Sequence, residues 1–192
     1  MITHHTQLLN ALIEKYNLKS YLEIGVQNPA NNFDKINTEF KIGVDPEVTS
    51  GSVYKTTSDE YFKSTFVEIF DLIFIDGLHT ADQVKRDFEN SLRCLSDNGF
   101  IVIHDVLPEN EAGTIVPRET KQWWGDVYKW AMNISQYAGI GYKTFSIDNG
   151  CMLVWKDSSR VNRSDYEPYK TDYKHYLLQG KISMNETSIV EI

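Results

Sequence analysis

The chain has 192 residues, a length that suits one domain with room for a sizeable hydrophobic core. Hydrophobic residues make up 41% and charged residues 24%, and no apolar run reaches the roughly 20 residues that a membrane span needs. The net charge of −8 disfavours nonspecific binding to nucleic acid, which needs clustered lysine and arginine against phosphates. We therefore expect a small-molecule ligand, and no nucleic-acid or membrane partner.

The N-terminus and the cysteines indicate the compartment. No basic flank followed by an apolar stretch opens the sequence, so we expect no signal peptide. Two cysteines, Cys94 and Cys151, argue against a disulfide scaffold or a cysteine-based zinc site. A reducing, cytoplasmic location is the expectation.

Amphipathic segments and short apolar runs alternate along the chain. The spacing of Leu8, Leu9 and Leu12 predicts a helix, and the near-continuous apolar run over 71–76 is typical of a parallel strand buried on both faces. The expected elements are, in chain order, a helix over 8–16, strands over 21–24, 41–45 and 53–56, a helix over 58–69 with Ser58 as N-cap, a strand over 71–76, a helix over 80–95 ended by Asn98-Gly99, a strand over 100–104, a helix over 127–135, and strands over 142–145 and 151–155.

This alternation predicts an α/β fold with an open, mostly parallel sheet and right-handed crossovers. The last two strands flank Asp148-Asn149-Gly150 and predict a terminal antiparallel hairpin, which pure dinucleotide-binding folds lack. We expect one domain over 1–159. The polar, tyrosine-rich segment 160–192 is expected to be an extension packed on that domain.

Ligands of open α/β sheets bind at the carboxyl ends of the strands, where this sequence carries several acids. Gly25 lets a ligand approach the backbone, and the carboxylate of Asp45 can accept two hydrogen bonds from a ribose diol. The alternatives are a plain turn glycine and a helix cap. Because Gln27 and Pro29 stand where a G-x-G-x-x-G loop needs glycines, a cofactor without phosphates is favoured.

A second group of chemically active residues follows the next two strands. Asp76 and His79 follow one strand, and His104 and Asp105 end its expected neighbour, so their side chains can converge. Carboxylates with imidazole suit a divalent cation with open positions, and His79 also suits a general base. The alternatives are Asp76 as a helix cap, His104 as a satisfied edge histidine and His79 as a turn residue.

Three tryptophans lie within eight residues after a long loop. We expect Trp130 to belong to the core and Trp123 to form an exposed wall of an acceptor pocket. Asp126 is the expected N-cap of the following helix. The preceding loop, 107–122, has the length of a lid over a site.

Five motifs together resemble class I S-adenosylmethionine-dependent methyltransferases, in particular a small bacterial subfamily with an Ile-Asp-Gly-x-His signature. The motifs are Tyr-Leu-Glu-Ile-Gly-Val at 21–26, Ile-Gly-Val-Asp-Pro at 42–46, Thr-Ser-Asp-Glu-Tyr-Phe at 57–62, Phe-Ile-Asp-Gly-Leu-His at 74–79 and Ile-His-Asp-Val at 103–106. The resemblance covers roughly residues 18–156. It implies a Rossmann-like methyltransferase fold, with a seven-stranded sheet of order 3-2-1-4-5-7-6 and helices on both faces.

The resemblance also implies roles for single residues. The methionine portion of the cofactor would contact Glu23, Gly25 and Asn28, and the ribose would contact Asp45. The adenine would contact Pro46, Ser58 and Asp59. The sulfonium side would face Asp76, Gly77 and His79. Related metal-dependent enzymes bind magnesium through an acid at the position of Asp76 and an acidic pair, here His104-Asp105. Histidine in place of the first acid favours a transition metal. Related sugar enzymes have their catalytic base at the position of Leu78. Leucine cannot act as a base, so His79 is the candidate base in this chain.

The resemblance implies O-methylation of a small hydroxylated acceptor such as a carbohydrate. His79 would act as the base, with Asp105 and His104 as catalytic or metal-holding partners. Two alternatives stay open: a nicotinamide-dependent oxidoreductase on a doubly wound sheet, and a non-catalytic binding module with a methyltransferase fold. The aromatic tail could also serve an oligomer interface.

Overall fold

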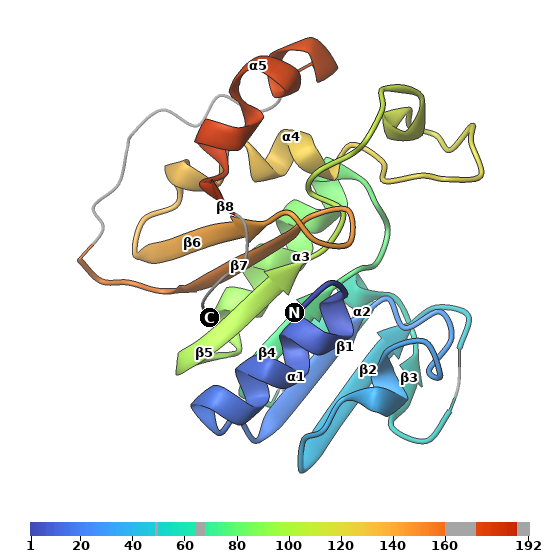
Figure 1. The fold of residues 1–192 in the computed structure, drawn as a ribbon. Helices are drawn as coiled ribbons and strands as arrows, with labels where there is room; N and C mark the ends of the chain where they lie inside the picture. The colour runs from blue at the N-terminus through green and yellow to red at the C-terminus, as the bar shows by residue number, and fades with distance from the viewer. Residues whose placement is uncertain (49, 64–67, 160–171, 188–192) are drawn as a thin grey trace.

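The computed structural model describes residues 1–48, 50–63, 68–159 and 172–187. Helices and strands alternate through most of the chain (Figure 1). The strands are β1 (Ser20–Ile24), β2 (Phe40–Asp45), β3 (Val53–Lys55), β4 (Phe70–Ile75), β5 (Leu95–Ile103), β6 (Ile140–Phe145), β7 (Cys151–Lys156) and β8 (Glu186–Thr187). The α-helices are α1 (His5–Tyr16), α2 (Ser58–Phe62), α3 (Ala81–Arg93), α4 (Val127–Ala131) and α5 (Tyr173–Ser183), with 3-10 turns η1 (Phe33–Lys35), η2 (Ala112–Thr114) and η3 (Ile134–Gln136).

All of these strands join one sheet of order β3-β2-β1-β4-β5-β7-β6-β8. The first five strands in this order are parallel, and β7 pairs antiparallel with both β5 and β6. The predicted order and the terminal hairpin are therefore confirmed. The sheet has eight strands, not seven, because Glu186 and Thr187 pair in parallel with the outer edge of β6.

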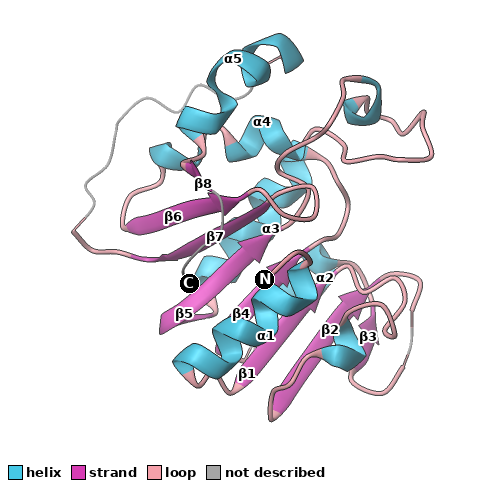
Figure 2. Cartoon of the chain, in the orientation of Figure 1, coloured by secondary structure: helices cyan, strands magenta, loops and turns pink. Residues whose placement is uncertain are grey.

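Alternating side chains of the central strands enter two cores. On one face, Tyr21, Leu72 and Phe74 pack with the buried leucines of α1. On the other face, Leu22 and Ile73 pack with residues of α3 and α4. Helices therefore cover both faces of the sheet, with α1 in front of β1 and β4 and α3 behind (Figure 2).

Some predicted boundaries are wrong. Thr57, not Ser58, is the N-cap of α2, since its hydroxyl accepts from the amide of Glu60. That helix ends at Phe62, and part of its expected continuation, 64–67, lies outside the described residues. α3 ends at Arg93 because β5 begins at Leu95 and contains Asn98-Gly99 in an irregular stretch opposite Phe70–Leu72.

The extension that begins at 160 lies outside the described residues as far as 171, and again over 188–192. Its described part forms α5 and β8, and Tyr176 of α5 packs against the core on the α3 face. Cys94 and Cys151 are both buried and free. Among the described residues, no helix is long and apolar enough to cross a membrane.

Candidate functional site

A cavity of about 900 Å³ lies at the carboxyl ends of β1, β2, β4 and β5. Most of the predicted cofactor residues line it, namely Glu23, Gly25, Asp45, Pro46, Ser58, Asp76, Gly77 and His79. Asn28 and Asp59 do not. Asn28 caps its own turn through Ala30, and Asp59 accepts hydrogen bonds from Gln83 and Arg86.

Gly25 directly follows β1 and lies against the backbone that follows β4. Its φ is +87°, and a Cβ there would lie 2.2 Å from the carbonyl oxygen of Asp76. Its amide donates to Val44 of β2, while the Asp76 amide donates to Ile24 of β1. The glycine therefore lets three strand ends meet beside the cavity.

Glu23 is buried at the wall of this cavity. One of its oxygens, Oε2, accepts hydrogen bonds from the Tyr21 hydroxyl at 2.5 Å and from Asn32 Nδ2 at 2.8 Å. Burial raises the pKa of Glu23 to about 8, although these two hydrogen bonds oppose the change. A cationic group entering the cavity would favour the ionised carboxylate.

Asp45 ends β2 and organises the loop after it. Its Oδ2 accepts from the amide of Gln27 at 2.8 Å, and its Oδ1 accepts from the amides of Glu47 and Val48. The alternative of a helix cap is wrong, because no described helix follows β2 before β3 and Asp45 instead binds loop amides. Each carboxylate oxygen has more than one lone pair, so Asp45 can still accept from a ligand in the cavity.

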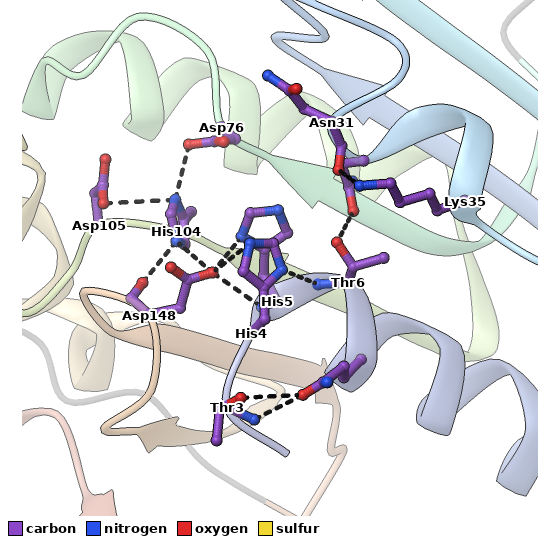
Figure 3. Close-up of polar contacts among 12 residues, drawn as sticks. Thr3, His4, His5, Thr6, Asn31, Lys35, Asp76, His104, Asp105 and Asp148 are labelled. Atoms are coloured by element: carbon purple, nitrogen blue, oxygen red, sulfur yellow. Dashed lines mark hydrogen bonds and ion pairs between the residues drawn. The ribbon is translucent and has the colours of Figure 1, made fainter.

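His104 lies between two acceptors. Its Nδ1 is 3.0 Å from Oδ1 of Asp76, and its Nε2 is 2.6 Å from the backbone oxygen of Asp148 (Figure 3). Neither a carboxylate nor a carbonyl oxygen donates, so both ring nitrogens carry protons and the ring is an imidazolium. Burial lowers the pKa of His104, but the carboxylate of Asp76 outweighs this and holds it well above its usual value.

Asp76 is the charge partner of that imidazolium. Burial alone would raise the pKa of Asp76, but the charge and hydrogen bond of His104 hold it well below its usual range. Asp76 does not cap the following helix, because Thr80 does so through its hydroxyl. The ionised carboxylate therefore faces the cavity with a fixed orientation.

His79 lies between two carboxylates from different strands. Its Nδ1 is 3.1 Å from Oδ2 of Asp105, and its Nε2 is 3.5 Å from Oδ1 of Asp76. Burial lowers the pKa of His79, but Asp76 and Asp105 together outweigh it and raise the pKa above the ordinary value of 6.5. Because Asp105 and the Trp123 carbonyl, 3.3 Å away, are both acceptors, Nδ1 carries the proton of the neutral ring.

Trp123 forms the outer wall beside His79. The two rings stack with centroids 5.3 Å apart and planes 12° apart, and Trp123 lines the cavity as predicted. Trp124 and Trp130 are buried, so the core prediction for Trp130 is confirmed. The side chain of Asp126 makes no cap bond to α4 and instead accepts from the amide of Ala81 at the start of α3.

The predicted metal ligands lie together, but their grouping differs from the prediction. Asp76, His79 and Asp105 present ligand atoms within 4.8 Å of one another, whereas His104 uses both nitrogens as donors. Asp105 is buried with a φ of +58°, and its Oδ1 makes no hydrogen bond among the described residues but lies 3.4 Å from Nδ1 of His104. Burial raises the pKa of Asp105, although both histidines oppose the change.

Sequence reasoning missed His4, His5 and Arg118, which also line the cavity. The paired histidines at the start of α1 were the available signal. Because these histidines are far in sequence from the residues at the strand ends, the sequence does not show that they lie beside them. Arg118 lies in the predicted lid segment, with its guanidinium 5.9 Å from the ring centroid of Trp123.

Residues 16–106 match the family model of a methyltransferase domain. Three solved structures share the fold at low identity. The SAH-bound methyltransferase PaMTH1 from Podospora anserina is 14% identical, with a TM-score of 0.61 over 80% of this chain and 78% of that one. An O-methyltransferase from Bacillus cereus in complex with SAH is 14% identical, with a TM-score of 0.58 over 80% of each chain.

The third is the MycE methyltransferase of the mycinamycin biosynthetic pathway, in complex with Mg, SAH and mycinamycin VI. It is 15% identical, with a TM-score of 0.51 over 86% of this chain and 51% of that chain. At these identities the likeness concerns the fold. The family model matches a little under half of this chain, and the solved structures share its fold.

Proposed function

We propose that this protein is an S-adenosylmethionine-dependent O-methyltransferase that acts on a hydroxyl group of a small acceptor, with a carbohydrate as the favoured class. The observation that carries the proposal is the position of His79. It lies between Asp76 and Asp105 at one end of a cavity whose other residues suit an adenosyl ligand.

The residues of the cavity fit this cofactor. The buried carboxylate of Glu23 suits the ammonium of its methionine portion, and Lys35, which also lines the cavity, suits the carboxylate. Asp45 would accept from the ribose hydroxyls, and Pro46 would lie against the adenine. Gln27 and Pro29 leave no glycine-rich cradle for a diphosphate. The cofactor would supply an electrophilic methyl group.

The residues of the chain would activate the acceptor. The neutral His79 ring holds its proton on Nδ1, directed at Asp105, so Nε2 is the nitrogen that removes the acceptor's hydroxyl proton. The resulting imidazolium would be stabilised by Asp76, whose Oδ1 lies 3.5 Å from Nε2. Trp123 would hold the ring plane and exclude water.

The donor set does not fit the magnesium site that the sequence resemblance implies. Magnesium needs several oxygen ligands, but His104 stands in place of the first acid and already neutralises Asp76 as an imidazolium. A cation among Asp76, His79 and Asp105 would also displace the proton that orients His79. The proposed reaction therefore uses no metal at these residues.

The proposal is tested by incubating the protein with S-adenosylmethionine and a panel of sugars, catechols and carboxylic acids, and measuring S-adenosylhomocysteine release. We expect release with at least one hydroxylated acceptor. Cofactor binding without release across the panel would instead support a non-catalytic binding module.

A further inference from the structure

His4, His5 and Asp148 form a second cluster that the proposed reaction does not use. His4 is the N-cap of α1, His5 is its first residue, and Asp148 lies in the turn between β6 and β7. Oδ2 of Asp148 is 2.6 Å from Nδ1 of His5 and 3.6 Å from Nε2 of His4. Figure 3 shows the two rings and the carboxylate converging on one point, so segments about 140 residues apart meet there.

The backbone holds Asp148 in this position. Oδ2 of Asp148 also accepts from the amide of His5 at 3.0 Å, and the Asp148 carbonyl accepts from His104 Nε2. The residue has a φ of +46° in this turn, and its contacts with His5 hold the side chain against the start of α1. The carboxylate is therefore preorganised.

His5 supplies a separate indication that a ligand belongs here. Its side chain is only 12% exposed, packed between Phe74 and His104. Nδ1 is buried, and its 2.6 Å contact with Oδ2 of Asp148 is an ion-pair contact whose angles are not those of a hydrogen bond. A buried nitrogen without a well-directed hydrogen bond is costly, and a cation bound by both Nδ1 and the carboxylate would satisfy the two groups once they separate slightly.

We propose that His4, His5 and Asp148 bind a divalent transition-metal ion. Two imidazoles and one carboxylate suit zinc, iron, nickel or copper, whereas magnesium prefers oxygen ligands. Three protein ligands leave coordination positions open. Both histidines line the cavity, so the ion would lie at the cavity wall. The ion would tie the start of α1 to the β6–β7 turn at the cavity wall.

Ion binding requires two small changes. Nδ1 of His4 accepts from the amide of Thr6 at 3.2 Å, so coordination through Nε2 puts a proton on Nδ1 and releases this cap bond. Loss of one such cap is small beside the stabilisation that a bound zinc ion gives to structural zinc sites. The side chains of His5 and Asp148 must also separate slightly. His4 adapts freely because its side chain is 49% exposed.

The test uses the full-length protein, stripped of metal with EDTA and titrated with Zn²⁺ by calorimetry and with Co²⁺ by visible absorption. We expect one ion at this site, and His4→Ala and Asp148→Asn to weaken binding at least about 100-fold. His175→Ala removes an exposed histidine of α5, and His79→Gln disrupts the neighbouring cluster; both should leave this binding unchanged. Excess Mg²⁺ should not compete.

His4→Ala keeps the test independent of folding, since its half-exposed side chain is not part of the core, and circular dichroism of the metal-free variants checks this. Failure of the wild-type protein to bind either ion overturns the proposal. So does binding that persists in His4→Ala and is lost in His79→Gln. Neither result depends on methyl transfer.

Discussion

Nδ1 of His79 lies 3.1 Å from Oδ2 of Asp105, although the two residues follow different strands, β4 and β5. Parallel pairing of these strands brings their carboxyl ends together and creates the contact. The contact fixes which nitrogen of His79 faces the acceptor. The proposed reaction depends on it, because a base must present an unprotonated nitrogen in a set direction.

Removing either partner should abolish most methyl transfer and leave cofactor binding intact. We expect His79→Gln to lower kcat by about 10²–10⁴-fold, the usual contribution of a general base, and Asp105→Asn to lower it less. Binding of S-adenosylhomocysteine should change little, as measured by calorimetry. His175→Gln, on the exposed side of α5, is the matched control. Wild-type rates in both active-site variants would disprove the assigned roles.

The rate should depend on pH through His79. The base must be neutral, and Asp76 and Asp105 raise the pKa of His79 above 6.5. Transfer should therefore increase as the pH rises, with a midpoint above 6.5. Asp105→Asn removes one carboxylate, so the midpoint of its residual activity should move to lower pH. A pH–rate profile of kcat checks both statements, and an unchanged midpoint in Asp105→Asn would contradict them.

Glu23 should make the ligand-free protein less stable at alkaline pH. Its pKa is 4.5 as a free side chain and about 8 in the fold, so the folded state binds more protons between these values. The associated stability is present below pH 4.5 and is lost as the pH rises through 8. Each pKa unit corresponds to about 1.4 kcal/mol.

Glu23→Gln removes this titration and keeps a side chain of the same shape. We expect it to raise the free energy of unfolding by a few kcal/mol at pH 9, with little effect at pH 4. Urea unfolding at the two pH values measures the difference. Equal effects of the substitution at both values would show that burial does not raise the pKa of Glu23.

Gly25→Ala should disrupt the meeting of β1 and β4. The new Cβ would lie 2.2 Å from the Asp76 carbonyl oxygen, and φ is +87°. Gly51→Ala is the matched control, because its φ is +53° but no atom lies within 4 Å of the added Cβ. Gly51→Ala should cost about 1–2 kcal/mol through its backbone alone, and Gly25→Ala at least about 2 kcal/mol more. Denaturant unfolding of both variants tests the difference.

The parts of the fold with a strong local signal could be predicted from the sequence. The apolar run before Asp76 and the Asn149-Gly150 turn gave β4 and the hairpin, and together with the family resemblance they predicted the strand order. β8 could not be predicted, because two residues carry no periodicity and their pairing with β6 depends on where the chain returns. The start of β5 could not be predicted either, because Asn98-Gly99 has the composition of a turn.

The sequence predicted only those site residues that directly follow strands of the sheet. Asp76, His79 and Asp105 follow neighbouring strands, so their convergence was predictable. The charge on His104 was not, because it depends on the carbonyl of Asp148 in a turn that is distant in sequence. His4 and His5 reach the cavity only because α1 packs across β1 and β4, which is tertiary information.

We propose that the cavity binds an adenosyl cofactor without phosphates. Calorimetric titration of the wild-type protein with S-adenosylhomocysteine and, separately, with NADH tests it most directly. We predict one S-adenosylhomocysteine site per chain and no heat of binding with NADH. Binding of NADH without binding of S-adenosylhomocysteine would show that the cavity is not an adenosylmethionine site and would favour the oxidoreductase alternative.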